Sequence, residues 1–130
     1  MPAGAGPNLL ASWIGMLGGI LSGIVMGLYF HDEAWMGGYS TFPRRLIRLG
    51  HIAFFGLGFL NFAFAFTARV VPITGFLLRL ASWSLIVGLI TMPLCCFLTA
   101  WRKALRRLFP IPVASVLVGI AAILAGWTHP

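Results

Sequence analysis

The chain has 130 residues, of which 60% are hydrophobic and 8% are charged, and its net charge is +7. Soluble domains carry roughly one quarter charged residues, so this composition excludes a water-soluble globular domain and predicts an integral membrane protein. A chain of this length leaves no room for a second, soluble catalytic domain beside its membrane spans.

The first apolar run, from Leu9 to Phe30, contains no charged residue. At about 1.5 Å per residue it extends roughly 33 Å, enough to cross a hydrocarbon core of about 30 Å. No basic segment precedes it and no small-residue cleavage pattern follows it, so we expect a retained span and not a signal peptide. Glycine recurs at every fourth position, which predicts a helix-packing stripe that lets another backbone come close. The stripe consists of Gly15, Gly19, Gly23 and Gly27.

Three more apolar runs follow, at about residues 46–67, 73–100 and 110–127. Each is long enough to span a bilayer as a helix. The four runs together predict a single transmembrane domain, an all-α integral membrane four-transmembrane-helix bundle. Its helices alternate up-down-up-down, so both termini lie on one side of the membrane.

The basic residues concentrate in the first and third connections and at their edges: Arg44, Arg45, Arg48, Arg102, Lys103, Arg106 and Arg107. Positive charges in short loops remain cytoplasmic, which predicts cytoplasmic first and third loops and external termini in a cell inner (plasma) membrane. Because these cations lie directly beside membrane spans, we expect lipid headgroups or an acidic partner to contact them, and no nucleic acid.

His51 is the one histidine within a predicted span, and an ionisable group there is a functional-site hypothesis. At the same predicted depth the third span carries Met92 and Cys95, one helical turn apart. Imidazole and sulfur ligands suit copper, zinc or haem iron, so haem or copper is a possible cofactor. The alternative, which the sequence favours, is that the sulfur side chains fill the interior and His51 bridges two helices by a hydrogen bond.

Asn61 lies deep in the second predicted span, among phenylalanines. An amide in hydrocarbon needs a polar partner, and Ser82 or Ser84 in the third span, or Ser12 in the first, is placed to supply one. We therefore predict a polar contact between helices here. The same groups would otherwise contact a permeating ion or solute.

No catalytic constellation is present in the sequence. The two acidic residues, Asp32 and Glu33, are adjacent in the first loop, which excludes separated carboxylate pairs and an acid for a serine–histidine triad. There is no phosphate-binding glycine loop and no zinc-protease motif. We therefore expect that the protein is not an enzyme. We expect an accessory or structural subunit of a larger membrane assembly, in contact with other membrane helices. The alternative is a homo-oligomeric channel or carrier for a small ion or solute.

Overall fold

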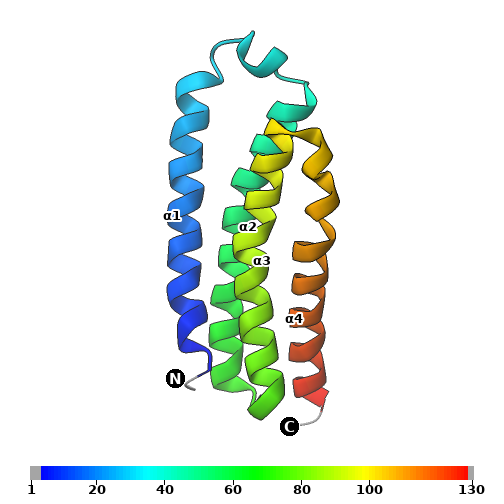
Figure 1. Cartoon of the computed structure of the whole chain (residues 1–130). Coiled ribbons are helices and arrows are strands. Elements are labelled where there is room, and N and C mark those ends of the chain that lie inside the picture. Colours follow the sequence, from blue (N-terminus) through cyan, green and yellow to red (C-terminus); the bar gives the residue numbers. More distant parts are fainter. Residues whose placement is uncertain (1–3, 129–130) are drawn as a thin grey trace.

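The computed structural model describes residues 4–128, and its regular elements are all helices. Four long helices alternate in direction, and the described chain begins and ends at the same end of the molecule (Figure 1). We call this end the terminal end and the opposite one the basic end. The predicted fold class is confirmed. The elements in chain order are α1 (Gly6–Tyr29), η1 (Trp35–Gly37), α2 (Phe42–Val70), α3 (Gly75–Trp101), η2 (Lys103–Leu108) and α4 (Pro110–Thr128).

All four long helices are long and apolar enough to cross a membrane, so the chain has the architecture of a multi-pass membrane protein. The second helix begins at Phe42, earlier than the predicted Leu46. Proline is favoured in a first helical turn, where its missing N–H is not needed, and Pro43 occupies that turn. As a result Arg44 and its basic neighbours lie on α2 itself, and not in the loop before it.

The helices form an open row. α1 packs mainly on α2, α2 on α3, and α3 on α4, whereas α1 makes only a smaller contact with α3 (Figure 1). The apolar window of α3 is accordingly 39% buried, against 17% for each of the two edge helices. The outward faces of α1 and α4 are therefore apolar surfaces exposed to lipid or to other helices.

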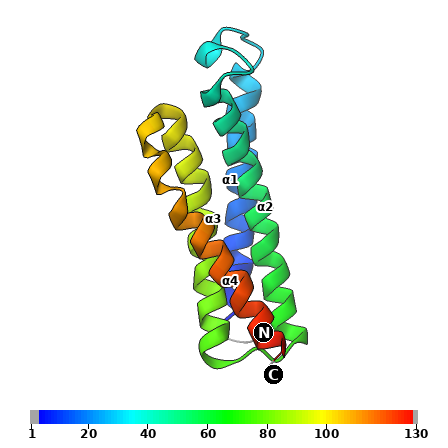
Figure 2. The ribbon, with the colours of Figure 1, turned by 90° about the vertical axis from the view of Figure 1, so that its right-hand side faces the viewer.

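The hydrophobic core gathers at the terminal end. Phe64 of α2, Leu85 of α3 and Ala122 of α4 belong to it, and each is at most 4% exposed. Towards the basic end, the α3–α4 pair diverges from the α1–α2 pair (Figure 2). The bundle is thus closed where the chain begins and ends, and it opens towards its loops.

Candidate functional site

A cluster of polar side chains lies within the terminal half and joins three helices. The Asn8 amide of α1 donates to Asn61 Oδ1 of α2 over 2.7 Å and to the Ser82 carbonyl of α3 over 3.1 Å. The Ser82 hydroxyl in turn donates to Asn8 Oδ1. Asn8 and Asn61 are fully buried and Ser82 is 3% exposed. One polar site therefore holds α1, α2 and α3 together.

The side-chain amide of Asn61 is hydrogen-bonded as fully as that of Asn8. Asn61 Nδ2 donates to the Leu85 carbonyl of α3 over 3.1 Å and to the Leu57 carbonyl of its own helix over 2.9 Å. Both N–H groups of Asn61 are thus used, and its oxygen accepts from Asn8. All the amide N–H groups of Asn8 and Asn61 therefore donate to acceptors within the chain.

Two of the serines proposed as partners of Asn61 make no hydrogen bond with it. Ser12 donates to the Leu9 carbonyl of its own helix, and the Ser84 carbonyl accepts a hydrogen bond of 2.6 Å from Ser115 of α4. Asn8 was not among the predicted partners because the first span was placed from Leu9 onwards. The helix in fact begins at Gly6 with Pro7 in its first turn, which brings Asn8 into the bundle.

The predicted glycine stripe runs along α1: Gly15, Gly19, Gly23 and Gly27. A methyl group added at Gly15 would lie 2.8 Å from Leu89 of α3, and one added at Gly19 would lie 2.5 Å from the Phe55 ring of α2. Both added atoms would meet side-chain atoms, so a larger residue at either position requires Leu89 or Phe55 to shift. At Gly27 an added methyl group meets nothing within 4 Å. Most of the stripe therefore receives side chains of the same chain.

His51 of α2 packs against the third glycine of this stripe. Its Nδ1 lies 3.0 Å from the Ser22 hydroxyl of α1, and a methyl group added at Gly23 would lie 2.9 Å from the ring. Phe55 meets the His51 ring edge-on at 5.4 Å between centroids. His51 thus bridges α1 and α2 by a hydrogen bond.

The predicted sulfur and imidazole layer lies in the basic half. Cys95 and Cys96 are buried free thiols, and Cys96, the neighbour of the predicted ligand, lies beside Gly50 of α2. Met92 is partly buried on the same helix. Within residues 4–128 no group of three His, Cys, Asp or Glu side chains is placed to hold a metal ion. A site built from His51, Met92 and Cys95 stays a prediction.

Two of the predicted headgroup-binding arginines hold the first loop. Arg44 is 1% exposed, donates to the Asp32 carbonyl, and lies 5.0 Å from the centre of the Phe30 ring. Arg48 donates to the Tyr39 carbonyl over 3.0 Å and lies 4.2 Å from the centre of that tyrosine ring. Each arginine combines a hydrogen bond with a cation–π contact, so the loop is fastened to α2.

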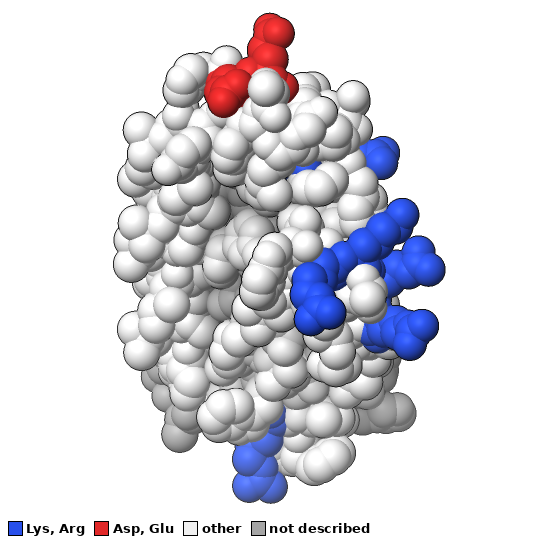
Figure 3. Space-filling view, turned by 45° about the horizontal axis from the view of Figure 1, so that its top comes forward, with Lys and Arg blue, Asp and Glu red and all other residues white. Residues whose placement is uncertain are grey.

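The remaining basic side chains of the prediction are exposed: Arg45, Arg102, Lys103, Arg106 and Arg107. Three of them surround Ala104 on η2 and line a depression of about 320 Å³, which we call the basic depression: Lys103, Arg106 and Arg107. In Figure 3 most of the visible Lys and Arg side chains gather on one side of the molecule, apart from the two acidic side chains at the top of the view. The basic depression has the charge needed to attract phosphate or carboxylate groups.

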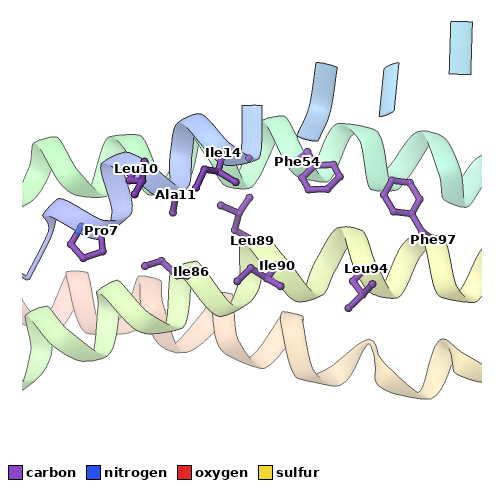
Figure 4. Close-up of a pocket in the computed structure, with 11 residues that line it drawn as sticks. Pro7, Leu10, Ala11, Ile14, Phe54, Ile86, Leu89, Ile90, Leu94 and Phe97 are labelled. Atoms are coloured by element: carbon purple, nitrogen blue, oxygen red, sulfur yellow. The ribbon is translucent and has the colours of Figure 1, made fainter. Parts of the chain in front are cut away.

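A long apolar crevice separates α1 from α3, with α2 as its floor. Its volume is about 500 Å³, and it extends from Pro7 and Ile86 to Leu94 and Phe97 (Figure 4). Beyond Phe97 a second hollow of about 530 Å³ continues towards the basic end. Val25, Trp35 and Trp101 line this inner hollow. We call the first of these the α1–α3 crevice and the second the inner hollow.

Comparison with known proteins assigns no function to these features. No protein-family model matches the chain, and neither a curated protein nor a solved structure does so.

Proposed function

We propose that this chain is an accessory or structural subunit of a larger assembly in the cell inner membrane. The observation that carries the proposal is the open row of helices, because the apolar windows of α1 and α4 are each only 17% buried. Two unpaired apolar edges suit a protein that packs between other membrane helices.

The orientation belongs to the proposal as well. The first and third loops lie in the cytoplasm, since the basic side chains cluster there, and both ends of the chain are external.

Ser40 in the first loop and Thr74 between α2 and α3 are exposed. In intact cells, a membrane-impermeant maleimide should label Thr74→Cys, and should label Ser40→Cys only after permeabilisation. The parent protein, whose two cysteines are buried, is the control. The reverse labelling pattern would contradict the orientation.

The assembly role is tested by isolating the tagged chain from its own membranes at its native expression level. We expect a particle larger than one chain, with the same second membrane protein in every preparation. Size-exclusion chromatography with light scattering and mass spectrometry measures both properties. Recovery of the chain alone, as a monomer in several mild detergents, would contradict the proposal.

A matched pair of substitutions locates the contact. Leu17 on α1 is 55% exposed and Leu117 on α4 is 66% exposed, so each can become tryptophan without meeting the chain's own core. Leu17→Trp should release a partner bound at the α1 edge, and Leu117→Trp one bound at the α4 edge. If both variants keep a complete assembly, neither edge is the contact surface.

A homo-oligomeric channel or carrier is the weaker candidate. Its proposed lining residues are Asn61, Ser82 and Ser84, and the first two are buried and hydrogen-bonded within one chain. A pore needs such groups to face the permeating species. Purified chain in liposomes should leave an ion gradient intact, and a leak abolished by Asn61→Leu would instead support the channel.

A further inference from the structure

The α1–α3 crevice combines length with a narrow, apolar interior. Along α3 it extends from Ile86 to Phe97, about 17 Å at 1.5 Å per residue, before the inner hollow begins. Its lining side chains are aliphatic or aromatic, and in Figure 4 they lie between the α1 and α3 ribbons. Only an apolar occupant can replace lipid or detergent there without leaving a polar group unpaired.

The volume of the crevice indicates how much hydrocarbon it can hold. A volume of about 500 Å³ along this length corresponds to a cross-section of roughly 30 Å². An apolar cavity of about 150 Å³ holds one benzene molecule, so the crevice has room for roughly twenty carbon atoms. These dimensions fit a hydrocarbon chain.

The charge at one mouth of the crevice indicates which polar group the bound molecule carries at that end. Trp101 lines the inner hollow, and Lys103 of the basic depression lies two residues further along the chain. Two residues separate Cα atoms by less than about 8 Å, so the depression adjoins the mouth. Trp35 and Met36 of the first loop line the opposite side of this hollow, so Asp32 and Glu33 lie near that side. The three exposed cations of the basic depression outnumber these two carboxylates, and the η2 side of the mouth suits an anionic group.

We propose that the α1–α3 crevice binds one acyl chain of an anionic phospholipid, whose phosphate contacts the basic depression. The chain enters sideways from the leaflet at the basic end, where the two helix pairs diverge (Figure 2). The arginines of η2 supply planar donors for the phosphate oxygens, and Lys103 supplies a point charge. This lipid site is independent of the proposed assembly role, because it needs one copy of the chain only.

Native mass spectrometry of the purified chain tests the site, with phosphatidylglycerol and phosphatidylcholine of identical acyl chains as probes. We expect phosphatidylglycerol to bind at least about tenfold more tightly, since several cations face its net negative charge. Neutralising the depression with Lys103→Gln, Arg106→Gln and Arg107→Gln should remove this preference. The matched control is Arg69→Gln with Arg79→Gln, which removes two exposed cations from the terminal end.

The hydrocarbon half of the site is tested by filling the crevice. Ile90 lines it and is 59% exposed, so Ile90→Trp should weaken binding of both lipids about tenfold or more. Ala11→Leu fills the crevice from the α1 side, and it is the alternative test if Ile90→Trp fails to fold. Ile120→Trp on the outer face of α4 is the control, and it should leave lipid binding unchanged.

Three results would overturn the proposal. The first is equal affinity for the two lipids, which would remove the role of the basic depression. The second is unchanged lipid binding in folded Ile90→Trp and Ala11→Leu, which would place the acyl chain elsewhere. The third is a dimer of the parent chain that Ile90→Trp dissociates while lipid binding persists, which would make a second copy the occupant.

Discussion

The two ends of the bundle are held together by different means. At the terminal end, helices α2, α3 and α4 share the hydrophobic core, and α1, α2 and α3 share the Asn8–Asn61–Ser82 cluster, which we call the polar cluster. At the basic end, two arginines fasten a loop to α2, and the helix pairs diverge around the α1–α3 crevice (Figure 2). The polar cluster joins three helices, whereas towards the basic end the two arginines join a loop to α2 and His51 joins α2 to α1 alone.

The difference between the two ends distinguishes polar groups that stabilise the fold within the membrane from polar groups that are available to bind a ligand or partner. In hydrocarbon a polar side chain is tolerated when its partners are inside the protein, and the polar cluster meets that condition. Around the basic depression the charged groups remain exposed beside an apolar hollow. We infer that the terminal end supplies stability and that the basic end is available to ligands or partners.

The largest expected effect comes from breaking the polar cluster. Asn61→Leu leaves the Asn8 amide without one acceptor and removes the side-chain donor that the Leu85 carbonyl receives from α2, at a cost of about 2 kcal/mol. Its matched control is Thr99→Val at the basic end, because the buried Thr99 hydroxyl has no hydrogen-bond partner. Replacing it with a methyl group should leave the free energy of unfolding unchanged or raise it. Steric-trap unfolding in bicelles measures both variants, and equal losses would contradict the distinction between the two ends.

Overpacking the glycine stripe should have the next largest effect. A methyl group at Gly19 would lie 2.5 Å from the Phe55 ring, so Gly19→Ala should lower the free energy of unfolding by about 1 to 2 kcal/mol. At Gly27, near the basic end, an added methyl group meets nothing within 4 Å, and Gly27→Ala should not destabilise the isolated chain. A comparable loss in both variants would show that Gly27 is also packed.

The bridge between α1 and α2 should contribute less. Ser22→Ala and His51→Ala should each cost about 1 kcal/mol, since each removes the same hydrogen bond between helices. Their double variant should cost little more than either alone. The visible spectrum of the purified protein distinguishes this bridge from the haem hypothesis: a Soret band in the parent protein that His51→Ala abolishes would make His51 a haem ligand.

The smallest effect on global stability should come from releasing the first loop. Arg44→Met removes its hydrogen bond to the Asp32 carbonyl and its contact with the Phe30 ring. Limited proteolysis within the loop should accelerate severalfold, while the melting temperature of the helices changes little, because opening stays local. Exposed Arg45 provides the control, and Arg45→Met should leave the cleavage rate as it is. Unchanged cleavage in Arg44→Met would mean that the loop is held by other contacts.

The sequence predicted the helices well because length and hydropathy are properties of each segment alone. It also placed Asn61 and Ser82 on facing helices, and both belong to the polar cluster. Asn8 was missed because the first span was read from its apolar run, whereas α1 begins before that run, at Gly6.

The features of the basic end depend on tertiary structure. Arg44 is buried because the first loop folds back over it, which no periodicity in α2 indicates. The crevice depends on the angle at which the two helix pairs diverge, and that angle is set by side-chain packing along the whole bundle. A charge count identified the basic end, but not which arginines remain exposed.

A double-mutant cycle between Asn8 and Asn61 tests most directly whether intramembrane polar groups join the chain's own helices. Asn8→Leu, Asn61→Leu and the double variant are compared with the parent chain by their free energies of unfolding in bicelles. A buried contact of 2.7 Å between the two amides predicts a coupling energy of about 1 kcal/mol. Additive losses, with a coupling energy near zero, would show that the two amides act separately and would contradict the polar cluster.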